Sequence, residues 1–124
     1  MNEDLLKLFH QLKKLVEKYE GSLTAKIDDE GRYDLYSIKD VVIEGRKRKE
    51  VYFASLIIQK SYVGFYYMPI YSDVELKSVF GEDLLKLLKG KSCFHIKKLD
   101  EVLTKQLTEA LEIGYSLYKE RGWI

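Results

Sequence analysis

The most regular pattern of apolar and polar positions lies near the C-terminal end of the chain, from Leu99 to Tyr118. Apolar or small residues recur there at steps of three and four, which places them on one face of a helix. A strand could not present this spacing to a single surface. The pattern therefore predicts one long helix with a continuous apolar stripe and with Asp100 as its N-cap. The stripe consists of Leu99, Leu103, Leu107, Ala110, Leu111, Gly114, Leu117 and Tyr118.

A second helical stripe begins at Leu5 and reaches Tyr19. Asn2 precedes it as a candidate N-cap, and Gly21 follows it as a residue that can end a helix in the left-handed conformation. An amphipathic helix must bury its apolar face against another element, so both terminal helices need a broad apolar partner. The stripe consists of Leu5, Leu8, Phe9, Leu12, Leu15, Val16 and Tyr19.

Between residues 22 and 69 the period changes from helical to alternating, which is typical of strands. Turns containing Gly31 and Gly45 would join these strands as hairpins. Gly64, inside the last strand, predicts a bulge or a surface that another group approaches closely. The strand at 50–59 is nearly continuous in apolar residues, which suits a central strand packed on both faces. The predicted strands are 22–28, 32–43, 50–59 and 62–69, with turns at 28–32 and 44–50.

Pro69 ends the last of these strands because proline has no N–H for the ladder. Two short helices are predicted after it, at 74–80 and 82–88, with Ser72 or Asp73 as the first N-cap, and a fifth strand follows at 91–96. The strands are grouped together and the long helices lie at the ends of the chain. We therefore expect an α+β fold, in which an antiparallel meander of about five strands packs against both terminal helices in one domain spanning residues 1–124.

Tyrosine is unusually frequent in the predicted strands, and the chain holds ten tyrosines in 124 residues. The tyrosines at 33, 36, 52, 62, 66 and 67 cannot all point into one core. Tyrosine side chains suit a half-hydrated pocket or an interface, although they could equally pack the sheet with their hydroxyls in solvent. The first interpretation predicts a site for a small molecule or a protein partner, in a cleft between the curved sheet and the long C-terminal helix, with space left by Gly64 in its floor. Its candidate residues are Tyr36, Tyr52, Gly64, Tyr66, Cys93 and His95.

Cys93 and His95 are two residues apart in a predicted strand, so their side chains should share one face. Both residue types ligate metals, and a stabilised thiolate is a nucleophile. A structural zinc site needs about four ligands, and no second cysteine or histidine pair completes one. The alternative is a buried, inert cysteine beside a histidine with a structural hydrogen bond. With no phosphate loop, catalytic carboxylate pair or nucleophile elbow in the sequence, we expect a protein that is not an enzyme.

The segments EVYFASLIIQKSYVGFYYMP and KGKSCFHIKKLDEVLTKQL, followed by GYSLYKERGW, resemble the YdhG-like family of bacterial domains of unknown function. The resemblance covers residues 50–123 and extends to the N-terminal third only in length and order. It implies an α+β domain with an antiparallel sheet backed by terminal helices. Some members of the family carry an iron-chaperone label because their fold is similar to that of frataxin. The resemblance brings no set of catalytic residues.

The frataxin-like alternative predicts iron binding by exposed carboxylates, since hard oxygen ligands bind iron without trapping it. Asp28, Asp29 and Glu30 at the first predicted hairpin are the candidate ligands. Lysines such as Lys13 and Lys26 are interleaved with these acidic residues and lower the local negative potential. A solvated charged surface is the competing interpretation.

The charge balance disfavours a nucleic-acid-binding protein, because 21 basic and 20 acidic residues leave a net charge of only +1. Arg46, Lys47, Arg48 and Lys49 form the one dense basic cluster. Such a cluster at a hairpin tip could contact phosphates, but it could also discourage edge-to-edge pairing of strands.

No apolar run is long enough for a membrane span, and the start of the chain lacks the pattern of a signal peptide. The single cysteine, Cys93, cannot form an internal disulfide. These features lead us to expect a cytoplasmic protein without a membrane segment, as a monomer or weak homodimer.

Overall fold

A six-stranded antiparallel sheet and two long helices dominate the computed structural model, which describes residues 3–124. The strand order is β1-β2-β5-β6-β8-β7, and a separate two-stranded ribbon pairs β3 with β4. The predicted α+β class with an antiparallel sheet is confirmed. Asn2, the candidate N-cap, lies outside the described residues. The strands are β1 (Thr24–Asp29), β2 (Arg32–Ser37), β3 (Val41–Ile43), β4 (Arg46–Arg48), β5 (Val51–Ile58), β6 (Val63–Tyr67), β7 (Leu88–Lys89) and β8 (Cys93–Ile96). The helices are α1 (Glu3–Val16), η1 (Glu17–Tyr19), α2 (Met68–Ser72), η2 (Val74–Ser78), α3 (Glu82–Leu85) and α4 (Glu101–Glu120).

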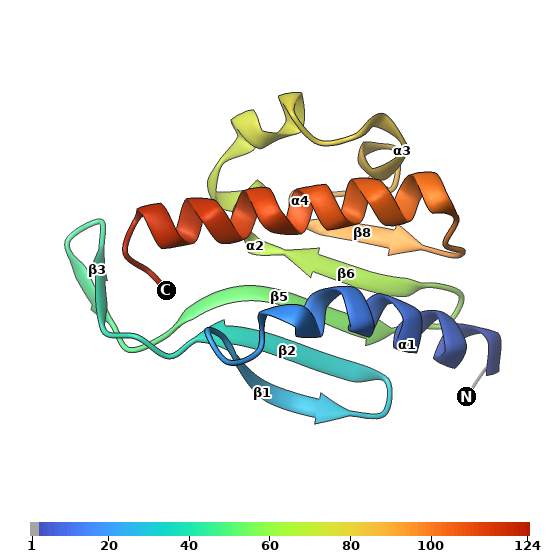
Figure 1. Cartoon of the computed structure of the whole chain (residues 1–124), viewed down its shortest axis with the longest axis horizontal. Helices are drawn as coiled ribbons and strands as arrows, with labels where there is room; N and C mark the ends of the chain where they lie inside the picture. The colour runs from blue at the N-terminus through green and yellow to red at the C-terminus, as the bar shows by residue number, and fades with distance from the viewer. Residues whose placement is uncertain (1–2) are drawn as a thin grey trace.

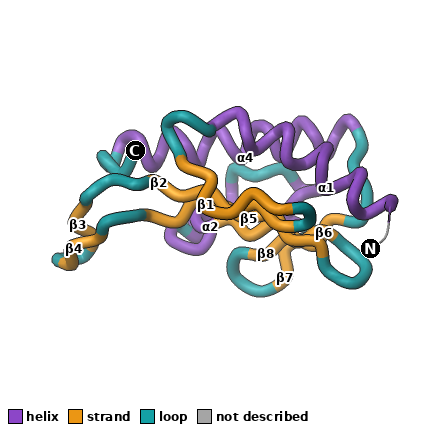
Figure 2. The backbone as a smooth tube through the Cα atoms, turned by 90° about the horizontal axis from the view of Figure 1, so that it is seen from below, coloured by secondary structure: helices purple, strands orange, loops and turns teal. Residues whose placement is uncertain are grey.

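The two long helices, α1 and α4, lie side by side on the same face of the sheet, which we call the covered face (Figures 1 and 2). Asp100 caps α4 as predicted, since its carboxylate accepts a hydrogen bond from the Leu103 N–H at 2.8 Å. The apolar stripes of both helices are buried against aromatic residues of the central strands, among them Phe53, Phe65 and Phe94. The helical periodicity therefore predicted which side of each helix meets the sheet.

Tyr67 and Gly114 form the closest contact between the sheet and α4. The Tyr67 side chain is fully buried, and its hydroxyl donates to the carbonyl oxygens of Ala110 at 2.7 Å and Leu111 at 3.2 Å. A Cβ on Gly114 would lie 2.0 Å from that hydroxyl oxygen. Gly114 is thus needed in the middle of the helix because the end of the Tyr67 ring occupies the space of a side chain.

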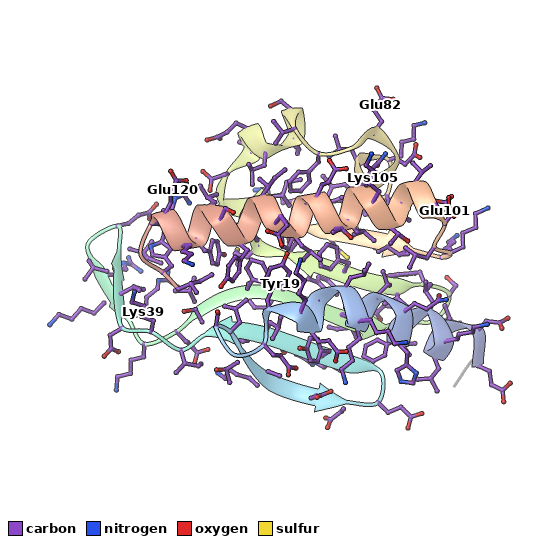
Figure 3. All side chains as sticks on the ribbon, viewed as in Figure 1. Tyr19, Lys39, Glu82, Glu101, Lys105 and Glu120 are labelled. Carbon is purple, nitrogen blue, oxygen red and sulfur yellow. The ribbon has the colours of Figure 1, made fainter. Side chains whose placement is uncertain are left out.

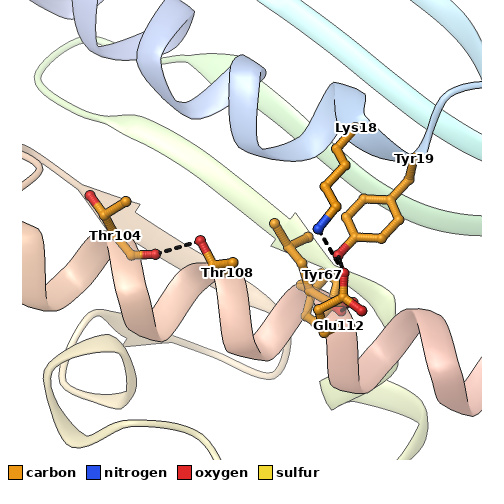
Figure 4. A network of polar contacts seen from close by, with 7 residues as sticks. Lys18, Tyr19, Tyr67, Thr104, Thr108 and Glu112 are labelled. Carbon is orange, nitrogen blue, oxygen red and sulfur yellow. Dashed lines mark hydrogen bonds and ion pairs between the residues drawn. The ribbon is translucent and has the colours of Figure 1, made fainter.

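A polar contact also joins η1, directly after α1, to α4 (Figure 4). The Tyr19 hydroxyl donates to Glu112 Oε1 at 2.6 Å, and Lys18 Nζ lies 3.0 Å from the same oxygen. Burial raises the pKa of Tyr19 well above its ordinary value, and the bond to Glu112 raises it further. Lys18 and Glu112 are largely exposed, so the position of the two helices depends mainly on their apolar stripes rather than on this ion pair.

The predicted long strand at 32–43 is wrong, because β2 ends at Ser37 and β3 begins only at Val41. The Ser37 hydroxyl donates to the carbonyl oxygen of Trp123, so the C-terminal residues occupy the place beside the end of β2. The chain leaves the sheet there and forms the β3–β4 ribbon, which extends beyond the end of the sheet (Figure 1). The predicted turn at 44–50 is correspondingly shorter. Only Glu44 and Gly45 turn, both with positive φ, and Arg46–Arg48 is a strand.

The segment after β6 also differs from the prediction. Met68–Ser72 is a short helix with Pro69 in its first turn, where proline is tolerated because that N–H has no partner within the helix. The predicted helix at 74–80 is a 3-10 helix without a side-chain cap. The predicted helix at 82–88 ends at Leu85, because Leu88–Lys89 pairs with β8 as the additional edge strand β7.

The Asp73 side chain makes an ion pair instead of a cap. Arg121, just after α4, donates from Nη2 to Asp73 Oδ1 at 2.6 Å, and the Asp73 residue is 9% exposed. The bond from Arg121 lowers the pKa of Asp73 below its ordinary value. The pair connects the η2 segment to the C-terminal end of α4.

This ion pair predicts a pH-dependent contribution to stability. Asp73→Asn should lower the free energy of unfolding by about 1.5–3 kcal/mol at neutral pH, the range for hydrogen bonds to charged groups. Because the folded-state pKa of Asp73 is lowered, the contribution is present above the unfolded-state pKa and is lost as the pH falls through the folded value, below 3.8. Urea unfolding as a function of pH measures it, with the exposed Asp40→Asn as control. An equal deficit for Asp73→Asn at acidic and neutral pH would contradict the ionic origin.

Within residues 3–124 no helix has the length and apolar character that crossing a membrane requires.

Candidate functional site

All six predicted candidate residues lie on the sheet face opposite α1 and α4. The register aligns them in rows, because residues that pair across antiparallel strands project to the same side. Tyr36 pairs with Tyr52, Tyr66 pairs with Cys93, and Gly64 pairs with His95. The side chains of Tyr36, Tyr52, Tyr66, Cys93 and His95 are half-buried. We call this surface the tyrosine face. It also includes Tyr62, which is described later in this section.

The tyrosines divide between the two faces of the sheet. Tyr33 and Tyr67 are fully buried on the covered face, whereas Tyr36, Tyr52 and Tyr66 belong to the tyrosine face. The Tyr33 hydroxyl donates to the Glu20 carboxylate, and its burial raises the pKa of the phenol. The prediction that these tyrosines could not all enter one core is confirmed.

Tyr36 and Tyr52 form a ring pair at the β2–β5 end of the tyrosine face, with centroids 5.1 Å apart. Lys26 Nζ lies 4.5 Å from the centroid of the Tyr36 ring and bonds both carboxylate oxygens of Glu50, at 2.7 and 2.8 Å. The Tyr52 hydroxyl donates to Ser55 Oγ at 2.5 Å. Burial raises the pKa of Tyr52 to about 12, so its phenol stays protonated and can donate a hydrogen bond at neutral pH.

Tyr66 occupies the centre of this face, and its ring lies over Gly64. A Cβ on Gly64 would come within 2.8 Å of Tyr66 Cε2. The register of β6 continues through Gly64 without a shift, so the predicted bulge there is wrong, and the alternative prediction of a close approach is confirmed. Gln59 Nε2 donates to the Tyr66 hydroxyl at 3.0 Å. The predicted space above Gly64 is therefore filled by the protein's own ring.

Cys93 and His95 share one face, as predicted, but their side chains have different partners. Burial raises the pKa of the Cys93 thiol, although a hydrogen bond from Tyr66 acts in the opposite direction. A thiol with a raised pKa is protonated at neutral pH, which disfavours a nucleophilic role. His95 instead stacks on the ring of Tyr62, with centroids 3.8 Å apart and an angle of 12° between the rings.

Tyr62 is a site residue that the candidate set left out, although it belongs to the predicted strand at 62–69; in the structure it lies in the turn just before β6. Its alternation with Gly64 and Tyr66 is a signal that could have found it. Arg32 and Asp34 were missed as well. Their side chains meet in the rows next to the tyrosines, where Arg32 Nη2 donates to Asp34 Oδ2 at 3.1 Å. Asp34 is 4% exposed although it faces away from the long helices. Strand alternation places Arg32 and Asp34 on the same side as Tyr36, and that signal could have found them.

The predicted iron ligands do not converge. Asp28 is paired with Lys13 Nζ at 2.5 Å, and Asp29 and Glu30 are exposed at the β1–β2 hairpin. Within residues 3–124 no three histidine, cysteine or carboxylate side chains are grouped closely enough to hold a metal ion. Iron binding remains an untested prediction, and Lys13 would compete with a cation for Asp28.

The basic cluster Arg46–Lys49 lies on the β3–β4 ribbon, away from the tyrosine face (Figure 1). All four side chains are exposed. Val42, on the partner strand of the ribbon, is 64% exposed, so the ribbon is apolar as well as basic. The ribbon is therefore separate from the candidate residues on the sheet.

Comparisons of the chain with protein-family models, with curated proteins and with solved structures give no match. The resemblance to YdhG-like domains therefore stays a prediction. The interpretation of the tyrosine face rests on its geometry alone: rings contributed by three adjacent strands and one turn, with hydroxyl, thiol and imidazole groups between them.

Proposed function

We propose that the chain is a non-enzymatic binding module that holds a small molecule with a planar ring on the tyrosine face. The observation that carries the proposal is the common side of the sheet shared by Tyr36, Tyr52, Tyr66 and His95, with the two long helices on the other side. Aromatic side chains in such an arrangement offer stacking surfaces in addition to apolar area. Neighbouring hydroxyl groups can orient a bound ring by hydrogen bonds.

The stacked pair of Tyr62 and His95 supports a planar ligand in particular. Two parallel rings at 3.8 Å already show the contact that such a ligand would extend. The side chain of Tyr66 closes over Gly64, so a ligand that displaced this ring would reach the backbone of β6. Binding rather than catalysis is favoured because burial raises the pKa of the Cys93 thiol and because the His95 ring is engaged with Tyr62.

Titration of the labelled protein with indole, followed by amide chemical shifts, tests this proposal. Indole should shift amides of β5, β6 and β8. Cyclohexanol, which is apolar but not planar, should bind at least about twofold more weakly, because one stacking contact contributes about 0.5–1.5 kcal/mol. The double variant Tyr36→Leu and Tyr66→Leu keeps apolar area but removes two rings, so it should lose the indole shifts. Tyr71→Leu, which changes an exposed tyrosine outside this face, is the matched control.

Two outcomes would contradict the proposal. Indole shifts that survive in the double variant would place its binding elsewhere. Equal affinity for indole and cyclohexanol would show that planarity is irrelevant. Circular dichroism of each variant checks that the fold is retained. We expect it to be retained because the substituted positions on this face are only half-buried.

Native mass spectrometry of freshly purified protein measures the natural occupant and the assembly together. A retained mass of a few hundred daltons would support the small molecule, whereas a retained polypeptide would favour the protein partner that the sequence left open. The same spectrum tests the expected monomer or weak homodimer. A cytoplasmic location remains an expectation.

A further inference from the structure

A groove of about 520 Å³ lies at the β7–β8 edge of the sheet, where α3 and the start of α4 approach it. The backbone N–H of His95 donates to the Leu87 carbonyl at 2.9 Å, which fixes one wall to β8. The backbone N–H of Leu84 donates to Gln106 Oε1 at 2.9 Å, which fixes α3 to α4. Glu82 and Glu101, the first residues of the two helices, lie at this same end of the molecule (Figure 3). The groove is thus built by three anchored elements.

The lining of the groove is apolar in part and basic in part. Leu87 and Leu103 contribute apolar surface. Four lysines also line it, Lys86, Lys89, Lys97 and Lys98. Each lysine is largely exposed, and the ion pairs found within residues 3–124 use other cations.

The charge of the groove is higher than that of the chain. Four lysines against the two carboxylates in its wall, Asp83 and Asp100, leave +2, whereas the whole chain carries +1. The Asp100 carboxylate is moreover occupied as the cap of α4, where it accepts the Leu103 N–H at 2.8 Å. Positive charge gathered in a concave surface raises the local concentration of anions.

We propose that this groove binds a small organic anion, in which a phosphate or carboxylate group is attached to an apolar body. The ammonium groups would hold the anionic group as mobile point charges, while Leu87 and Leu103 would contact the apolar body. The volume falls within the range of about 300–1,000 Å³ that is usual for small-molecule sites. The groove shares only His95 with the candidate residues of the tyrosine face, so this site is distinct from the function proposed above.

Titration with phenyl phosphate, followed by amide chemical shifts of the full chain, tests the inference. Phenyl phosphate should shift the amides of Leu87 and Leu103, and phenol, which lacks the charge, should leave these two amides unchanged. The His95 amide is not a reporter here, because a planar ring on the tyrosine face would shift it as well. Benzoate distinguishes a preference for phosphate from one for carboxylate, and binding of either supports the site. The double variant Lys86→Gln and Lys97→Gln should raise the Kd of phenyl phosphate about fivefold, as expected for two partly exposed charge contacts. Lys77→Gln with Lys119→Gln, which changes exposed lysines outside the groove, should leave it unchanged.

Three results would overturn the inference: no shift with either anion at low salt, shifts that phenol reproduces, or an equal Kd in the groove variant and its control. The result is separable from that of the proposed function. Tyr36→Leu with Tyr66→Leu should leave phenyl phosphate binding intact, because neither tyrosine lines the groove.

Discussion

Replacing Gly114 by alanine will lower the free energy of unfolding by about 2–3 kcal/mol, the upper range for adding a methyl group to a packed core. Helix propensity alone would predict the opposite, since alanine is favoured over glycine in a helix interior by about 1 kcal/mol. The clash decides the sign, because the new Cβ would lie 2.0 Å from the Tyr67 hydroxyl oxygen and 2.8 Å from Pro69 Cγ. Urea unfolding monitored by circular dichroism measures the effect.

A double-mutant cycle with Tyr67→Phe tests the reason for this loss. Removing the hydroxyl takes away the nearest atom, so Gly114→Ala should cost less in the Tyr67→Phe background than in the original chain. A stabilising Gly114→Ala, or additive effects of the two substitutions, would mean that Tyr67 and α4 are not in contact.

Phe53→Ala is expected to have the largest effect of a single truncation, a loss of about 3–5 kcal/mol. Phe53 is fully buried on the covered face, with its ring centroid 5.4 Å from those of Tyr67 and Tyr118. It therefore connects the sheet to α4, and its removal leaves a cavity among rigid rings.

Tyr66→Ala is the matched control, because it removes an aromatic ring of similar size from the opposite face. Tyr66 is half-buried and is covered by no long helix, so its loss should cost no more than about 1 kcal/mol. Chemical denaturation of both variants gives the comparison. Equal losses would contradict the assignment of one face to the core and the other to binding.

Local periodicity predicted much of the fold and the common side of Cys93 and His95. The stripe from Leu99 to Tyr118 gave α4 and its buried side, and alternation placed Cys93 with His95. Both inferences need only the spacing of side chains within one element. The predicted N-cap at Asp100 also depends only on residues close in the chain. The hydrogen bond from the Leu103 N–H to the Asp100 carboxylate confirms this cap.

The features of the fold that the sequence could not predict depend on pairing between segments that are distant in the chain. The apolar run at 50–59 favoured a strand packed on both faces, but a register shift opposite Leu35 makes both Phe53 and Ala54 buried. The edge strand β7 is too short to have a period of its own. The end of β2 depends on Trp123, which is remote in sequence.

Prediction of the candidate site from the sequence was limited in the same way. The candidate residues were expected to surround a cleft beneath the long helix, with Gly64 in its floor. Instead they lie on the opposite face, because Phe65 and Tyr67 point toward the helices and Gly64 and Tyr66 alternate with them. The stack of Tyr62 on His95 joins a turn to a strand, and the spacing of residues within one segment cannot show such a pairing.

A nuclear Overhauser spectrum of the aromatic protons tests the two-faced sheet most directly. The Tyr67 ring should show strong cross-peaks to the α protons of Gly114, and the Tyr36 and Tyr66 rings should show none to α1 or α4. Cross-peaks from Tyr66 to either long helix, or their absence between Tyr67 and Gly114, would contradict the arrangement on which both proposed sites depend.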